Sequence, residues 1–124
     1  MILIASFSGA GFPEERRALL ISGDAPALRD LADRLAARAD GVLPVHRKRD
    51  TDPRLSIRLA FCDSAEDERF AATGGQVQLR FSPASAAVAR DSILELIGQP
   101  ERAFRYLDLR NPAQAAFTLV VQNY

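Results

Sequence analysis

The sequence predicts an α+β fold: a mostly antiparallel β-sheet with two helices packed on one face. Two observations carry this prediction. Two segments repeat apolar residues at helical spacing, and each begins at a capping residue. Other, shorter segments alternate apolar and polar residues, which is typical of antiparallel strands with one buried face. The chain has 124 residues, 48% of them hydrophobic, so we expect a single domain over residues 1–124 with its own core.

The first helix is predicted in the stretch ISGDAPALRDLADRLAARADG, residues 21–41. Asp24 suits the N-cap because its carboxylate can accept from free amides of the first turn, where Pro26 also fits. Gly41 follows the last turn, a usual place for a left-handed residue. The apolar stripe consists of Leu28, Leu31, Ala32, Leu35 and Ala39. Ser22-Gly23-Asp24 is therefore interpreted as a helix cap and not as a reactive turn.

The second helix is predicted to begin at Ser82 as N-cap, with Pro83 as its first residue, and to stop at Gly98 and Pro100. Its inner stripe consists of Ala86, Ala89, Ile93, Leu96 and Ile97. Leu-Leu-Ile-Ser precedes the first helix and Leu-Arg-Phe-Ser precedes the second. This similarity is too short to show a duplication, but it suggests one strand–helix plan used twice.

Strands are predicted before, between and after the helices. Residues 2–7 and 17–22 form a hairpin through the turn at 8–15, and the clearest alternation runs from Leu55 to Phe61. Further strands are predicted at 76–81, 103–109 and 115–122, with a short edge segment at 42–46. Residues 47–53 are interpreted as a charged loop and residues 63–75 as an acidic loop that ends in a Gly pair.

Charge and cysteine content limit the class of protein. The chain has 16 basic and 16 acidic residues, and its zero net charge argues against direct nucleic-acid binding. The single cysteine, Cys62, permits no intrachain disulfide, so we expect a reducing compartment, the cytoplasm. The apolar N-terminus lacks a basic region and is too short for a signal peptide or a membrane span. We therefore expect a soluble protein.

The usual catalytic patterns are missing from the sequence. The Gly9-Ala10-Gly11 turn has Glu14 where a dinucleotide fingerprint needs its third glycine. His46 is the only histidine, and Cys62 is its only possible soft partner for zinc or for a nucleophilic pair. We expect no cofactor, no metal site and no enzymatic activity.

Two surfaces are candidates for partner binding. The first is the acidic loop, whose carboxylates Asp63, Glu66, Asp67 and Glu68 would complement a basic partner such as a nuclease active site. The second is the polar sheet face, where Arg58, Arg80 and Arg105 should point away from the helices. Arginine is enriched where interfaces carry binding energy. The alternative interpretation of both surfaces is ordinary solvated protein surface.

The first half of the chain resembles small bacterial immunity proteins of polymorphic-toxin and contact-dependent growth inhibition systems. The resemblance rests on Ser22-Gly23-Asp24 at a strand end, on Leu31-Ala32-Asp33 in the helix, and on the strand from Leu55 to Phe61. The segment VLPVHRKRDTD replaces the usual link after the helix, and the second half matches no family pattern. The resemblance implies a cytoplasmic, non-enzymatic inhibitor that binds one cognate toxin domain, often a nuclease.

The function hypotheses are therefore three. The first is an immunity protein that neutralises a toxin domain by blocking its active site or its substrate access. The second is a small ligand-binding or regulatory domain that acts as a homodimer through its sheet. The third is an enzyme that uses Cys62 or His46.

Overall fold

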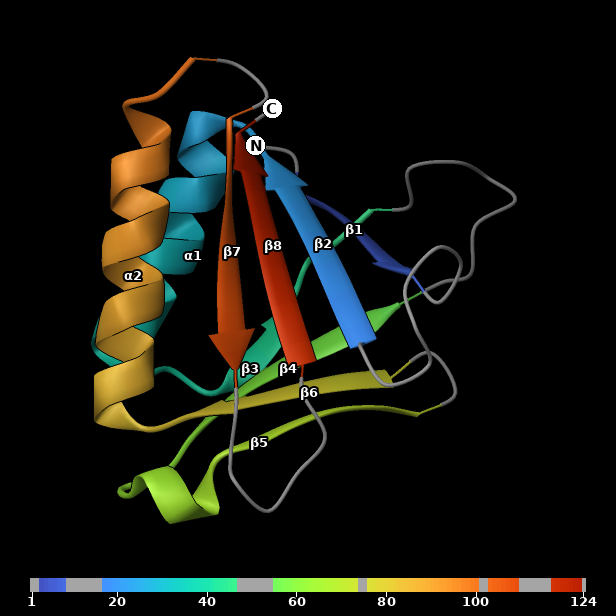
Figure 1. Ribbon diagram of the computed structural model, residues 1–124, viewed down its shortest axis with the longest axis vertical. Helices are drawn as coiled ribbons and strands as arrows, with labels where there is room; N and C mark the ends of the chain where they lie inside the picture. The colour runs from blue at the N-terminus through green and yellow to red at the C-terminus, as the bar shows by residue number, and fades with distance from the viewer. Residues whose placement is uncertain are drawn as a thin grey trace.

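The computed structural model describes residues 3–8, 17–46, 55–73, 76–100, 103–109 and 117–123 (Figure 1). The elements in chain order are β1 (Leu3–Ser8), β2 (Arg17–Gly23), α1 (Ala25–Ala37), β3 (Gly41–Leu43), β4 (Ser56–Phe61), η1 (Ala65–Asp67), β5 (Arg69–Thr73), β6 (Gln76–Phe81), α2 (Pro83–Ile97), β7 (Phe104–Leu109) and β8 (Phe117–Asn123). The predicted α+β class is confirmed, and most strand pairs are antiparallel.

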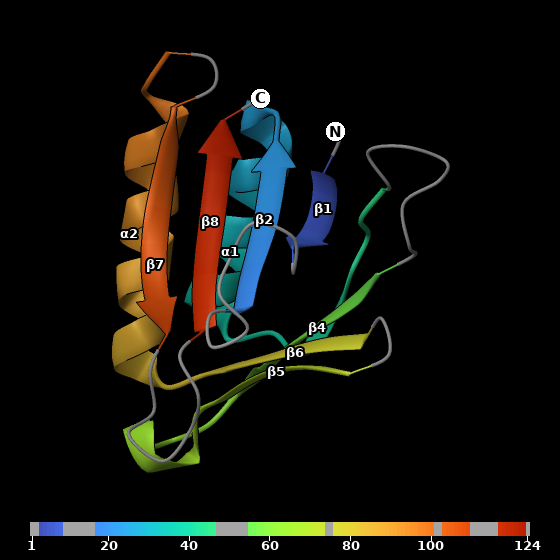
Figure 2. The ribbon, with the colours of Figure 1, turned by 45° about the vertical axis from the view of Figure 1, so that its right-hand side comes forward.

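The strands of the described residues form two four-stranded sheets and not the single sheet predicted. Sheet A has the order β1-β2-β8-β7, and sheet B has the order β3-β4-β6-β5. The central strands of each sheet, β2 with β8 and β4 with β6, pair in parallel, and the outer strands pair antiparallel. Sheet B runs across the lower end of sheet A (Figure 2).

One structural plan occurs twice along the chain. Two strands, a helix and two strands run from β1 to β4, and the same series runs from β5 to β8. In this repeat, β1 to β4 correspond in order to β5 to β8. Replacing each strand of sheet A by its counterpart gives the order β5-β6-β4-β3, which is the order of sheet B counted from its opposite edge. Each unit contributes one strand pair to each sheet, so the units interlock. The short similarity before the two helices corresponds to this repeat.

Helix α1 begins as predicted and ends earlier. The Asp24 carboxylate accepts a hydrogen bond from the Ala27 amide at 3.0 Å, and Pro26 lies in the first turn. The left-handed residue after the helix is Arg38, with φ 51° and ψ 45°, and not Gly41, which begins β3. Ala39 consequently lies outside the helix and is exposed. Arg38 adopts this conformation where its guanidinium reaches the carbonyl of Cys62.

Helix α2 matches the prediction at both ends. Ser82 and Ser85 form a reciprocal capping box, Pro83 follows in the first turn, and Gly98 is the C-cap. The helices pack against each other and against the sheets around one core. The buried apolar residues of the helices are Ala27, Leu28, Leu31, Ala32, Leu35, Ala86, Ala89, Ile93 and Leu96. Within the described residues, no helix combines the length and the hydropathy needed to cross a bilayer.

The predicted strands are present, and the acidic segment contains one more. The segment at 42–46 corresponds to the edge strand β3, which ends before Pro44. The loop predicted at 63–75 contains the short helix η1 and the edge strand β5. Strand β5 packs Phe70 against Phe81, with ring centroids 5.3 Å apart. Phe70 is the one large apolar residue of β5, and this contact buries it. A strand with a single such residue has no alternating sequence pattern by which it could be predicted.

Candidate functional site

The outer face of sheet B is polar and is exposed. Along β4, Ile57 and Leu59 are buried in the core, and Ser56 and Arg58, which alternate with them, are exposed. The same alternation continues on β6, where Gln76 is exposed and Gln78 and Arg80 are half-buried between core residues. Because side chains alternate across a strand, the hydrophobic pattern that fixes the inner face also places these polar groups together outside.

A hollow of about 400 Å³ lies on this face and extends over all four strands. Its lining residues are Val42, Ser56, Arg58, Arg69, Ala71, Gln76, Val77 and Gln78. The lining includes small side chains, such as Ser56 and Ala71, and long polar ones, such as Arg58 and Gln78. A concave surface of this kind suits a protruding polar segment of a partner better than a flat sheet does.

Three arginines lie on this face, and two of them, Arg58 and Arg69, line the hollow. Arg69 on β5 and Arg80 on β6 are direct cross-strand partners, and Arg58 lies on the adjacent β4 beside Gln78. Direct partners in a sheet have their Cβ atoms about 5 Å apart, and diagonal neighbours lie about 7–8 Å apart. No other residue of the described ranges forms a hydrogen bond or ion pair with these three guanidinium groups. Arg58 and Arg69 are exposed to solvent, and Arg80 is half-buried beside Arg69.

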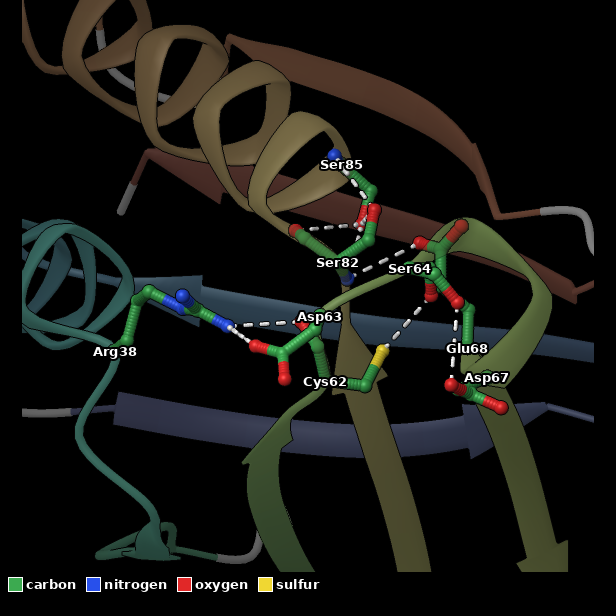
Figure 3. Close-up of polar contacts among 8 residues, drawn as sticks. All are labelled: Arg38, Cys62, Asp63, Ser64, Asp67, Glu68, Ser82 and Ser85. Carbon is green, nitrogen blue, oxygen red and sulfur yellow. Dashed lines mark hydrogen bonds and ion pairs between the residues drawn. The ribbon is translucent and has the colours of Figure 1, made fainter.

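The acidic loop has a different arrangement from the one predicted. Asp63, Glu66 and Asp67 are exposed, but Glu68 is buried with 8% of its surface accessible. The Glu68 carboxylate accepts a hydrogen bond from the backbone N–H of Ser82 at 3.4 Å (Figure 3). Glu68 thus binds the N-terminus of α2. The prediction that it lies on an exposed partner-binding surface is not supported.

Asp63 and Asp67 take part in local contacts (Figure 3). The Ser64 hydroxyl donates to Asp67 at 3.1 Å. Arg38 donates from Nη2 to the Cys62 carbonyl at 2.8 Å and lies 3.4 Å from the Asp63 carboxylate. Because the Asp63 side chain is fully exposed, this ion pair is weak, and the bond to the carbonyl is the firmer contact.

Cys62 lacks the environment of a nucleophile. Partial burial raises the pKa of its thiol, and the nearby carboxylates of Glu68 and Asp67 raise it further. The thiol donates to the Ser64 carbonyl at 3.3 Å. A reactive cysteine needs the opposite arrangement, in which positive charge stabilises the thiolate.

His46 and Cys62 also lie at opposite ends of β4. Leu43 of β3 pairs with Ile57 of β4, and the two strands are antiparallel. His46 follows Leu43 in one direction along the sheet, and Cys62 follows Ile57 in the opposite direction. At the usual rise of about 3.3 Å per strand residue, these positions are separated by roughly 25 Å. The structure therefore contradicts a Cys–His catalytic pair. Within the described ranges, no three His, Cys, Asp or Glu side chains are grouped so that they could hold a metal ion.

Arg105 lies away from Arg58 and Arg80. It belongs to β7 in sheet A, whereas the other two belong to sheet B. Its cross-strand partner is the core residue Val121, so Arg105 occupies the helix-facing side of an edge strand and reaches solvent past that edge. The predicted common face of the three arginines is wrong in two respects. Arg105 belongs to the other sheet, and its pairing with Val121 puts it on the helix-facing side.

Arg69 is the site residue that sequence reasoning missed. It lies in the segment that was interpreted as a loop, and the structure makes it part of β5. The available signal was the Gly74-Gly75 pair, since two glycines between short runs are typical of a tight hairpin. Thr73 pairs with Gln76 across these two residues.

Ser22 has a structural role next to the cap of α1. Its side chain is buried, and its hydroxyl donates to Gln122 Oε1 at 3.1 Å. Residues 9–16, which include the glycine turn, and the basic cluster at 47–49 lie outside the described residues. Comparison with protein-family models, with curated proteins and with solved structures finds no match to this chain.

Proposed function

We propose that this protein is a non-enzymatic immunity protein that acts in the cytoplasm and neutralises a cognate toxin domain by direct binding. The outer face of sheet B is the contact surface, and it blocks the active site or the substrate access of the toxin. One observation carries the proposal: two exposed arginines, Arg58 and Arg69, line a hollow on this face, and a third, Arg80, is the cross-strand partner of Arg69. Arginines of this kind are frequent among residues that dominate binding energy.

The charge of this face favours a different protein as partner over a second copy of the chain. A two-fold dimer places the same patch of both subunits in contact. A dimer with the two-fold axis at the centre of this face would bring Arg58, Arg69 and Arg80 close to their own copies. The like charges would repel, so this surface argues against the homodimer hypothesis.

The exposed acids of the loop border the same surface. Asp67 is two residues before Arg69, so negative charge lies at the end of sheet B where Arg69 and Arg80 pair. Adjacent patches of opposite sign orient a partner during encounter and exclude partners with the wrong charge pattern. Asp63, Glu66 and Asp67 therefore contribute to orientation, and the arginines form the centre of the contact.

The test is affinity capture of the tagged protein from its source bacterium, followed by mass spectrometry. We expect one stoichiometric partner whose isolated domain stops growth and whose effect is reversed by coexpression of this protein. The variant R58A/R69A/R80A should lose both capture and protection, whereas Arg29→Ala, an exposed arginine on α1, should retain them. Recovery of the protein alone, or with a bound metabolite, would contradict the proposal.

A further inference from the structure

We infer that Arg58, Arg69 and Arg80 form a carboxylate-binding site, whose occupant is a segment of the partner protein with at least two acidic side chains. This inference rests on the proposed function and names the partner chemistry. The three residues come from three adjacent strands of one sheet, so the backbone pairing holds their Cα positions rigidly. A rigid base reduces the ordering cost of binding.

The direct pairing of Arg69 with Arg80 is the first argument. Like charges directly opposite each other in a sheet destabilise the fold. In the described ranges no carboxylate forms an ion pair with either guanidinium. An anionic group placed between the two would replace this repulsion with two charge-assisted contacts.

The neighbours of the arginines are the second argument. The outward positions of β3, β4, β5 and β6 with described side chains are Val42, Ser56, Arg58, Ala60, Arg69, Ala71, Gln76, Gln78 and Arg80. None of these is acidic, and the exposed acid nearest to Arg69 in the sequence, Asp67, precedes β5 at the end of the sheet where Arg69 and Arg80 pair. The hydroxyl of Ser56 and the amides of Gln76 and Gln78 supply further hydrogen-bonding groups around the hollow.

The same positions distinguish a protein carboxylate from a nucleic-acid backbone. Proteins that bind single strands combine basic grooves with aromatic side chains on which bases stack, and this outward set contains no aromatic residue. The net charge of the whole chain is zero, which provides little long-range attraction for a polyanion. Guanidinium groups pair with carboxylates in a bidentate geometry, and three of them suit a cluster of acidic side chains.

The probe is a blocked synthetic peptide with four glutamates in eight residues, and the matched control peptide has glutamines in their place. Titration into the isotope-labelled protein at low salt should shift the backbone amides of β4, β5 and β6. The variant R69Q/R80Q should weaken binding about tenfold or more, and R29Q should leave it unchanged. The dissociation constant should rise with salt concentration.

Four results would overturn the site. The first is a shift pattern spread over the whole surface, and the second is equal loss of affinity in R29Q. The third is tighter binding of an oligonucleotide of matched charge through the same arginines. The fourth is concentration-dependent dimerisation, measured by sedimentation, that removes the peptide shifts, because the occupant would then be a second copy's acidic loop.

The affinity capture separates failure of the site from failure of the function. If the peptide binds sheet B but no toxin domain is captured, the carboxylate site stands and the immunity proposal fails. If a toxin domain is captured equally well by wild type and by R58A/R69A/R80A, the immunity proposal stands and the carboxylate site is wrong.

Discussion

The carboxylate of Glu68, at the end of the acidic loop, accepts a hydrogen bond from the backbone N–H of Ser82 at 3.4 Å. The same N–H also donates to the Ser85 hydroxyl at 3.1 Å. A negative charge at a helix N-terminus interacts favourably with the free amides and with the helix dipole. The loop is therefore attached to α2 through Glu68 and to the end of α1 through Arg38.

Replacement of Glu68 by alanine should destabilise the fold. The variant loses a buried acceptor and leaves a small void, and we expect a decrease of about 1–2 kcal/mol in the free energy of unfolding. Urea denaturation followed by circular dichroism measures this change. Glu95→Ala, an exposed acid on α2, should change stability by less than about 0.5 kcal/mol. Equal stability of the two variants would show that the contact with Ser82 contributes nothing.

Two substitutions at Arg38 separate its backbone conformation from its side-chain contacts. Both Arg38→Gly and Arg38→Ala remove the bond to the Cys62 carbonyl. Only alanine retains the cost of the left-handed conformation at φ 51°. We expect the glycine variant to be more stable than the alanine variant by about 1 kcal/mol. Thermal unfolding of the pair measures the difference, and a less stable glycine variant would contradict the geometry.

The thiol of Cys62 should react slowly at neutral pH. Burial and the nearby acids raise its pKa, so the folded protein contains less thiolate than the unfolded chain at the same pH. Alkylation by iodoacetamide, measured by mass spectrometry across a pH series, should show a midpoint above that of the urea-unfolded protein. A midpoint below it would restore the nucleophile hypothesis.

The same pKa difference predicts a decrease in stability at high pH. The thiol of Cys62 has a higher pKa in the folded state than in the unfolded state, and this difference contributes to the free energy of unfolding. Below the unfolded pKa both states are protonated, and this contribution to stability is fully present. As the pH rises through the folded pKa, the contribution is lost. The variant Cys62→Ser should lack this part of the pH dependence in urea titrations above neutral pH.

Removing one charge from the Arg69–Arg80 pair should stabilise the protein slightly. Arg69→Thr retains β propensity and removes a like-charge contact, which predicts a gain of about 0.2–1 kcal/mol at low salt. The gain should shrink as salt is added. Arg29→Thr serves as the comparison, since it removes a positive charge outside the sheet. Lower stability of Arg69→Thr at low salt would mean that the two guanidinium groups do not repel.

The starts of both helices and the faces of most strands were predictable because local chemistry sets them. Ser82 and Asp24 were identified as N-caps from their positions before Pro83 and Pro26, and both side chains accept the expected amides. The failures came where distant contacts override local preference. Glycine is the usual left-handed residue after a helix, yet Arg38 takes that conformation, and an added Cβ at Gly41 would meet nothing closer than 3.8 Å.

The candidate site was only partly predictable. Arg58 and Arg80 were identified because the alternation of their strands assigns them to the polar face. Arg69 was missed because β5 contains too short an apolar pattern to indicate a strand without its partner β6. Glu68 was expected among exposed acids, and its burial depends on the approach of α2 to the loop.

The sequence by itself determined two capped helices, the inner and outer faces of most strands, and the α+β class. Alternation and capping act within a few residues, so the residues involved are visible in the sequence. The tertiary structure decided that consecutive strands divide between two sheets, that Arg105 lies apart from Arg58, and that Arg69 faces Arg80. Backbone pairing between distant strands and the burial of one shared core determine these relationships, and neither leaves a pattern within a single segment.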